Sequence, residues 1–333
     1  YPEGDPAEYE APGAGEAPPA LGEPTKVVEP VSAYTPSTEL SDDYRCFLLP
    51  TEINEDTYLV ASGVVPGVQA MVHHALIYLI AADGLAAIEE LDSEDETPGY
   101  QCFGGPGGGA LTTLGAWVPG SVVQRTPADA AFVLPAGSRL VLQIHYNTLA
   151  LDGAAPPADL STVRLWTTPD KPASRVENLP MAHLGMQIPA GVEASVQERV
   201  FKMPVDGQIV GIAPHMHLLG SSIDVAFESA GAEPACLVDI PRWDFHWQQS
   251  YPFPAAGFID AKKGDDLRVR CTYDNSAANQ PIVAGTKQVP RDVTWGEGTL
   301  DEMCLAYVAT MVPYDAPDFR CGAYPECVSS CAA

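Results

Sequence analysis

The 333-residue sequence contains no apolar run near the ~20 residues that a membrane-spanning helix needs. Basic residues are also scarce, because 17 Lys and Arg stand against 44 Asp and Glu and give a net charge of −27. A surface of this charge repels nucleic acid and anionic membranes. We therefore expect no membrane span and no nucleic-acid partner.

The sequence has eight cysteines but no C-x-x-C pair, a pattern that favours disulfides over a zinc site. It also has no Asn-x-Ser/Thr glycosylation site, and it begins at Tyr1 without an apolar signal segment. Disulfides form in oxidising compartments, so the cysteines predict an extracytoplasmic protein (periplasmic, secreted or surface-tethered). The missing signal segment indicates that a signal or lipid anchor has been removed, and the missing glycosylation site favours a bacterial source.

Large aliphatic residues are almost missing from residues 1 to 40, which are rich in Pro, Glu and Ala. Such a segment cannot bury enough apolar surface to fold. The sequence predicts a disordered acidic tail at 1–40, which could act as a spacer or tether between an anchor and the folded body.

After residue 40 the sequence shows no sustained helical period, and short apolar runs alternate with Gly, Pro, Asp and Asn clusters. The clearest runs are at residues 58–61, 75–80, 139–146 and 305–310. A turn-rich stretch at 167–174 is the best domain boundary. The predicted fold class is all-β, with two consecutive antiparallel, jelly-roll-like β-sandwiches at 41–170 and 171–333, the second ending in a Cys-rich tail.

The first candidate metal ligands are His215 and His217, in the stretch G-I-A-P-H-M-H-L-L-G that begins at Gly211. On a strand, alternation places both imidazoles on one face, close enough to share a ligand. Apolar neighbours on both sides would hold the rings in a rigid, dry place, as a metal site needs. The alternative is a pair of core or surface histidines.

Four further residues are candidates with a simpler alternative. His73 and His74 are adjacent, so both can bind one ion only if the strand twists or bulges there. His145 lies near the end of a strongly apolar strand, where it is either a hydrogen-bonded core residue or a third ligand. Met303 would by default fill a core.

Four motifs, in the order V-H-H-A-L, L-Q-I-H-Y, P-H-M-H-L-L-G and D-E-M-C-L-A-Y, resemble the copper type II, ascorbate-dependent monooxygenases. This is the family of peptidylglycine α-hydroxylating monooxygenase and dopamine β-monooxygenase, and the resemblance spans about residues 42 to 312. It implies two coppers facing each other across an open cleft, one in each sandwich. The implied ligands are His73, His74 and His145 for the first copper, and His215, His217 and Met303 for the second.

The donor types suit copper independently of the resemblance. Two imidazoles and a thioether form a soft, neutral site that favours Cu(I), whereas hard cations prefer carboxylates and zinc prefers imidazole, carboxylate or thiolate. Three imidazoles bind Cu(II) comparatively better, as an electron-storing site requires. The other two histidines considered, His183 and His246, match no ligand position.

The resemblance also implies two disulfides, Cys46 with Cys102 and Cys271 with Cys304, the second beside the Met ligand. The four remaining cysteines allow three connectivities, and the sequence does not choose among them. They are Cys236, Cys321, Cys327 and Cys331.

The substrate is less defined. The peptide hydroxylase has an Arg two residues before the first His of the H-x-H motif, where this chain has Ala213, and an Asn where this chain has Leu305. Tyr307 matches a substrate-contacting Tyr of that enzyme. We therefore expect a monooxygenase that uses O2 and ascorbate, or a similar reductant, to hydroxylate a C–H bond of a small organic molecule, with His215, His217, Met303 and Tyr307 at the catalytic site.

Two alternatives remain. One is a peptide-modifying α-hydroxylase whose carboxylate anchor is Arg125 or Arg242. The other is a non-catalytic copper-binding protein on the same fold.

Overall fold

The computed structural model describes residues 20–37, 42–102, 105–107, 111–121, 123–151, 154–245, 247–283, 286–296, 298 and 300–317. Nearly every element is a strand, and almost every strand pair is antiparallel. The predicted all-β class is confirmed. Within these ranges no helix is long and apolar enough to cross a membrane.

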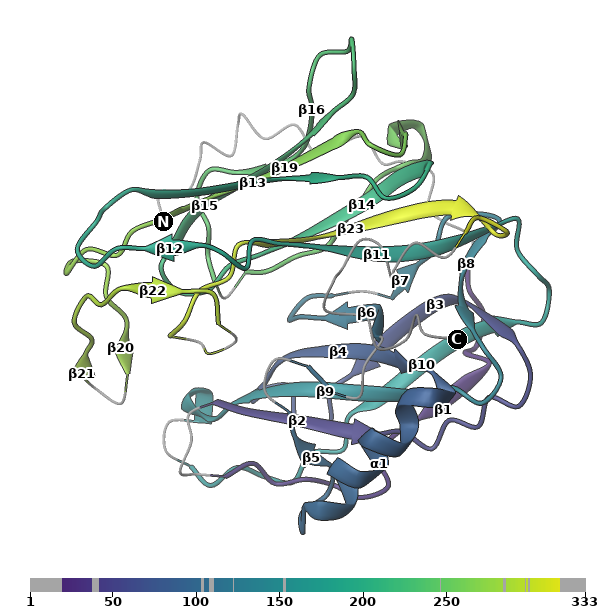
Figure 1. Cartoon of the computed structure of the whole chain (residues 1–333). Coiled ribbons are helices and arrows are strands. Elements are labelled where there is room, and N and C mark those ends of the chain that lie inside the picture. Colours follow the sequence, from purple (N-terminus) through teal and green to yellow (C-terminus); the bar gives the residue numbers. More distant parts are fainter. Residues whose placement is uncertain are drawn as a thin grey trace, which may run out of the picture.

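Two layers of strands form the lower sandwich of Figure 1. The outer layer is a five-stranded sheet in the order β5 (Tyr100–Gln101), β2 (Asp42–Leu48), β9 (Arg139–Asn147), β4 (Val72–Ile80) and β6 (Leu111–Trp117). The other layer begins a ten-stranded sheet with β1 (Lys26–Val28), β10 (Thr162–Thr168), β3 (Thr57–Val65), β8 (Ala130–Leu134) and β7 (Gln124–Arg125).

The ten-stranded sheet continues into the upper sandwich (Figure 1) through β11 (Ser174–Ala182), which pairs parallel with β8. Its further strands are β23 (Leu305–Pro313), β14 (Gly207–His215), β17 (Tyr251–Pro252) and β18 (Ile259–Ala261). A four-stranded sheet covers this part, in the order β13 (Ser195–Lys202), β19 (Asp266–Tyr273), β15 (Gly220–Glu228) and β16 (Ala235–Ile240). Two small ladders pair β12 (Gln187–Ile188) with β22 (Val293–Thr294), and β20 (Ile282–Val283) with β21 (Thr286–Lys287).

Each sandwich encloses its own apolar core, because alternate residues of the facing strands point inward. In the lower sandwich Leu142 and Ile144 of β9 pack against Leu59 and Val163 of the opposite layer. The neighbouring β9 residue His145 therefore lies on the outer face of its sheet. The sheet alternation thus places histidines outside the cores.

The same holds for the upper sandwich, where Ile212 of β14 and Val308 of β23 pack against Val225 and Leu267. Residues His215 and its cross-strand partner Leu305 belong to the opposite face of this sheet. That face lies toward the lower sandwich, since the Asn178 Nδ2 of β11 donates to the Thr113 carbonyl of β6 at 2.7 Å.

Two segments differ from the sequence prediction. Residues 20–37 fall within the predicted disordered tail, yet Lys26–Val28 forms β1 on the edge of β10. Val28 and Tyr34 give this part of the tail the apolar anchors it needs, because both are buried in the lower core. Residues Leu85–Glu94 form a helix, α1, held by the buried Ile88 above the outer face of the five-stranded sheet.

Candidate metal centre

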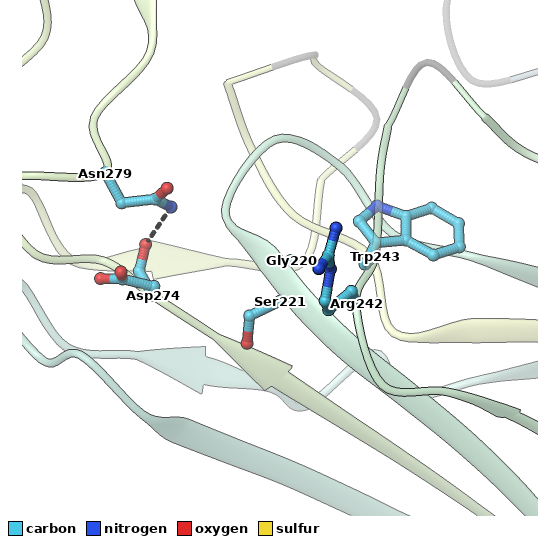
Figure 2. Close-up of a pocket in the computed structure, with 6 residues that line it drawn as sticks. All are labelled: Gly220, Ser221, Arg242, Trp243, Asp274 and Asn279. Carbon is cyan, nitrogen blue, oxygen red and sulfur yellow. Dashed lines mark hydrogen bonds between the residues drawn. The ribbon is translucent and has the colours of Figure 1, made fainter. Parts of the chain in front are cut away.

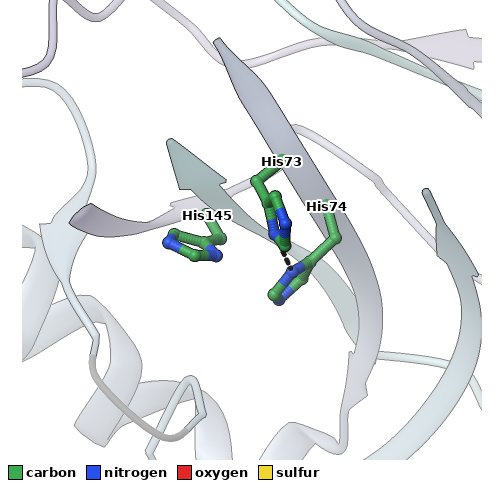
Figure 3. A group of neighbouring side chains, drawn as sticks. All are labelled: His73, His74 and His145. Carbon is green, nitrogen blue, oxygen red and sulfur yellow. Dashed lines mark hydrogen bonds between the residues drawn. The ribbon is translucent and has the colours of Figure 1, made fainter. Parts of the chain in front are cut away.

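His73, His74 and His145 converge at one end of the five-stranded sheet (Figure 3). The ladder between β4 and β9 shifts register between Val72 and His74, so a bulge at His73 lets both neighbouring histidines face His145. Their ligand nitrogens all lie within 4.8 Å of one another. The bulge predicted as the condition for a shared site is confirmed.

Hydrogen bonds select which nitrogen of His145 faces this group. Its Nε2 lies 2.8 Å from Asp42 Oδ1, so Nε2 carries the proton and donates to the carboxylate. Its Nδ1 is buried and has no hydrogen-bond partner among the described residues. A buried nitrogen without a hydrogen-bond partner destabilises the fold unless another group binds it. Its lone pair is therefore available to coordinate a metal.

The other rings of this group are also held in place. The Nδ1 atoms of His73 and His74 approach to 3.2 Å. Tyr44 stacks on His145 with ring centroids 4.1 Å apart and an interplanar angle of 9°. Burial, followed by the neighbouring imidazoles, lowers the pKa of His74 well below its usual value. A neutral imidazole keeps the lone pair that coordinates a metal.

His215 and His217 form the second group, at the end of β14. Their ring centroids lie 5.1 Å apart, and both rings lie on one side, as alternation predicted, while Met216 between them is buried in the upper core. His215 Nδ1 donates to Gln248 Oε1 at 2.6 Å, and His217 Nδ1 donates to the Asp301 carbonyl at 3.1 Å. Both bonds leave Nε2 as the lone-pair nitrogen.

Burial also keeps this pair neutral. Desolvation, strengthened by His217, lowers the pKa of His215 to about 3. Desolvation likewise lowers the pKa of His217 to about 4, against the opposing hydrogen bond to Asp301. At neutral pH both imidazoles can therefore accept a cation without first losing a proton.

Met303 lies on the segment that reaches this pair. It follows Asp301, whose carbonyl accepts from His217, and it precedes Leu305, which pairs with His215 in the β14–β23 ladder. Its own carbonyl accepts from the Tyr273 hydroxyl at 2.7 Å, and its side chain is buried. The backbone of Met303 is thus fixed beside both histidines.

Glu302 joins the histidine segment to the methionine segment. Its carboxylate accepts from the backbone N–H of His217 at 2.9 Å and from that of Leu219 at 2.6 Å. The residue is fully buried, and burial raises its pKa to about 8 against the three backbone N–H donors around it. The sequence shows Glu302 only as the acid before Met303, and nothing in the pattern predicts this contact.

Both disulfides that the resemblance implies are present, Cys46–Cys102 and Cys271–Cys304. The second attaches the residue after Met303 to β19. The sequence separation of Cys271 and Cys304 is 33. By the entropy of loop closure, a disulfide that closes a loop of this length stabilises the fold by about 4 kcal/mol. Cys236 is exposed and forms no disulfide with another described cysteine. Its three possible partners, Cys321, Cys327 and Cys331, lie outside the described residues.

The remaining candidates are placed as follows. Tyr307 pairs with Ala213, so it shares the sheet face of His215. Arg125 is exposed on β7, which pairs with β3. His183 is half-buried, and burial lowers its pKa. Its amide donates to the Cys304 carbonyl. His246 lies outside the described residues.

Arg242 lines a cavity of about 440 Å³ (Figure 2). Trp243, Ser221, Asp274 and Asn279 share this cavity. It adjoins the second histidine pair through Trp243, whose Nε1 donates to the His217 carbonyl at 3.2 Å.

Comparison with known proteins gives the class of this site. Residues 192–321 match the family model for the copper type II ascorbate-dependent monooxygenase, C-terminal domain. A human protein named "Putative DBH-like monooxygenase protein 2" is 23% identical over 286 residues. That match covers 80% of this chain and 52% of the relative, so the chain spans about half the length of that protein. The family predicted from the four motifs is confirmed, and the chain is related to the copper type II, ascorbate-dependent monooxygenases.

Similarity to solved structures is weak. Infectious bursal disease virus VP2, in its subviral particle, has a TM-score of 0.26 at 10% identity, covering 94% of this chain and 76% of that one. The T13 particle of the same virus has a TM-score of 0.22 at 10% identity, covering 87% and 78%.

The residues fit copper on grounds that the structure provides. The first group offers three imidazoles, one of them with an unpartnered buried Nδ1. The second offers two neutral imidazoles with Nε2 available and a buried methionine on the adjoining segment. Among the described residues neither group includes a carboxylate ligand, so both sets are neutral, and the thioether of Met303 would make the second one softer.

Proposed function

We propose that the protein is a two-copper monooxygenase that uses O2 and a one-electron reductant such as ascorbate to hydroxylate a C–H bond of a small organic substrate. The observation that carries the proposal is the presence of two separate imidazole groups, in which hydrogen bonds at the opposite ring position select the coordinating nitrogens of His145, His215 and His217. Bound copper would supply the one-electron redox chemistry. The family match supports the type of reaction.

The proposed roles follow the two groups. His73, His74 and His145 hold one copper, and Asp42 orients His145. His215, His217 and Met303 hold the other. Gln248 and Glu302 hold that second set in position. Tyr307 shares the sheet face of His215 and is proposed to contact the substrate.

We further propose that the chain divides into two domains near residue 170, each carrying one copper. β10 ends at Thr168 in the lower sandwich, and β11 begins at Ser174 and belongs to the upper one. The two disulfides support an extracytoplasmic location.

A small-molecule substrate is favoured over a peptide because Ala213 occupies the position of the peptide enzyme's carboxylate anchor. Neither alternative anchor lies on β14, the strand that carries Ala213. Arg242 lines the cavity that also contains Trp243, and Arg125 lies on β7. A guanidinium is the side chain best suited to hold a carboxylate by two hydrogen bonds.

Oxygen uptake tests the proposal. The copper-loaded protein is supplied with ascorbate and a panel of small substrates with benzylic or unactivated C–H bonds, beside a glycine-extended peptide. We expect substrate-dependent oxygen uptake with a hydroxylated small-molecule product, abolished in His217→Ala. Efficient α-hydroxylation of the peptide would favour the peptide-modifying alternative. Copper binding without substrate-dependent uptake across the panel would favour the non-catalytic protein.

A further inference from the structure

The residues between β16 and β17 contact histidines of both candidate copper sites. We call residues 242–245 and 247–248 the bridging segment. It belongs to the upper sandwich, yet one of its side chains reaches the histidine group of the lower one. No motif in the sequence indicates this role.

Two hydrogen bonds attach the bridging segment to the upper histidine pair. Trp243 Nε1 donates to the His217 carbonyl at 3.2 Å, and Gln248 Oε1 accepts from His215 Nδ1 at 2.6 Å. Gln248 Nε2 also donates to the Phe245 carbonyl at 3.0 Å. Phe245 is therefore held from both sides, by contacts that themselves orient the two histidines.

The Phe245 ring contacts one histidine of each site. It stacks on His73 with centroids 5.3 Å apart and an interplanar angle of 21°. It also meets His217 edge-on, at 6.0 Å and 86°. Only 8% of Phe245 is exposed, so a loop residue of one sandwich is buried against the histidines of both.

The chemistry of phenylalanine makes this position informative. A benzene ring has no atom that coordinates a metal or donates a proton, so it cannot compete with the imidazoles. It is apolar, so it excludes water from the space it occupies. If the sandwiches moved apart, the ring would lose its stack on His73 and become exposed, which is unfavourable.

We infer that Phe245 is a positioning residue that docks the bridging segment onto His73 and holds the two histidine sites face to face at one separation. The open cleft that the family resemblance implies is replaced here by an aromatic contact. Only the functional role of the distance between the two sites rests on the proposed function. The docking itself can be measured without copper.

Acylation of His73 by diethyl pyrocarbonate, followed by mass spectrometry, tests the docking in the metal-free full chain. We expect Phe245→Ala to raise the rate at His73 by roughly two- to tenfold, the range that corresponds to the loss of one aromatic stacking contact. Phe245→Leu keeps apolar volume and should give a smaller rise. Trp247→Ala is the matched control, because Trp247 lies on the same segment but is 68% exposed.

Phe245→Leu keeps the test decisive if Phe245→Ala does not fold, which near-ultraviolet circular dichroism would show. An unchanged His73 rate in every folded Phe245 variant would overturn the inference. An equal rise in Trp247→Ala would also overturn it, since general loosening of the segment would then explain the result.

Continuous-wave electron paramagnetic resonance of two bound Cu(II) ions gives a second, independent readout, because dipolar broadening reports short separations such as the one that Phe245 spans. Wild type and Trp247→Ala should show the same strong dipolar broadening, and Phe245→Ala weaker broadening. Unchanged broadening in Phe245→Ala would contradict the inference. A chain that binds no copper would fail the proposed function, while the acylation experiment would still report on Phe245.

Discussion

Asp42 Oδ1 accepts a hydrogen bond from His145 Nε2 at 2.8 Å, while the Nδ1 of the same ring is buried without a partner. The two residues lie 103 positions apart and meet because β2 pairs with β9. A carboxylate behind an imidazole fixes both the tautomer and the orientation of the ring, and it raises the basicity of the opposite nitrogen. Asp42 therefore prepares His145 for a metal before any metal arrives.

The first prediction concerns this carboxylate. Asp42→Ala should weaken copper binding at the three-histidine site by about 10- to 100-fold, the usual effect of losing such a partner. Asp42→Asn keeps an acceptor oxygen and should weaken it less. Competition with a copper chelator measures both, and affinity at the His215 and His217 site serves as the internal control. Wild-type affinity in Asp42→Ala would show that Asp42 does not support the site.

The second prediction concerns the number of sites. Fully loaded wild-type protein should contain two coppers, and the sites should fail separately, because their ligands come from different sandwiches. Metal analysis of His73→Ala and His145→Ala should find one copper, as should analysis of His217→Ala. One ion per chain in the wild type, or the loss of both ions in a single variant, would contradict two independent sites.

The sequence predicts the histidines themselves well because their positions depend on local geometry. The i, i+2 spacing brings together His215, at the end of β14, and His217, just beyond it, and two adjacent histidines can share a site only through an irregularity such as the bulge at His73. The partners Asp42, Gln248 and Glu302 could not be predicted in the same way. They reach the histidines through long-range strand pairing and loop closure, which no local pattern records.

Two elements of the fold show the same limit. The composition of residues 1–40 indicates disorder, yet two apolar side chains, Val28 and Tyr34, are enough to place β1 beside β10. Helix α1 is short and buries only one residue, Ile88, so it gives no helical period to detect. Both segments are decided by tertiary packing rather than by local propensity.

The third prediction concerns Glu302. Glu302→Gln replaces one acceptor oxygen with an N–H2 group that faces a backbone N–H, so it should lower the free energy of unfolding by about 1–3 kcal/mol. It should also weaken copper binding at the upper site, because the same carboxylate joins His217 to the Met303 segment. Urea unfolding and copper titration measure the two effects. Glu233→Gln is the control, since Glu233 is exposed, and an equal loss there would contradict the prediction.

The fourth prediction concerns pH. In the folded, metal-free protein the pKa of His215 is about 3 and that of His217 about 4, both below the usual 6.5 of the unfolded chain. Between the folded-state values and 6.5, the unfolded state therefore binds more protons than the folded state. The free energy of unfolding should fall as pH drops from about 6.5 towards 4. Each histidine contributes a slope of up to about 1.4 kcal/mol per pH unit.

Urea unfolding of the metal-free protein at pH 7, 6 and 5 measures this slope. The double variant His215→Gln and His217→Gln should show a flatter dependence, because two depressed groups have been removed. A wild-type slope no steeper than that of the double variant would show that the two imidazoles are not buried in their neutral form.

The last prediction separates the enzyme from a copper-storing protein at Met303. A thioether is a weak, soft ligand that favours Cu(I), whereas an added imidazole favours Cu(II). A site that must cycle between the two states benefits from the weaker ligand, and a storage site does not. Met303→His should therefore retain two coppers per chain yet lose most monooxygenase activity, while the His215 and His217 scaffold stays unchanged.

Met303→Leu keeps the buried apolar volume without a ligand, so it should lower Cu(I) affinity more than Cu(II) affinity. Chelator competition in both oxidation states and product analysis measure these effects. If Met303→His hydroxylates substrate as fast as wild type, Met303 serves packing rather than chemistry.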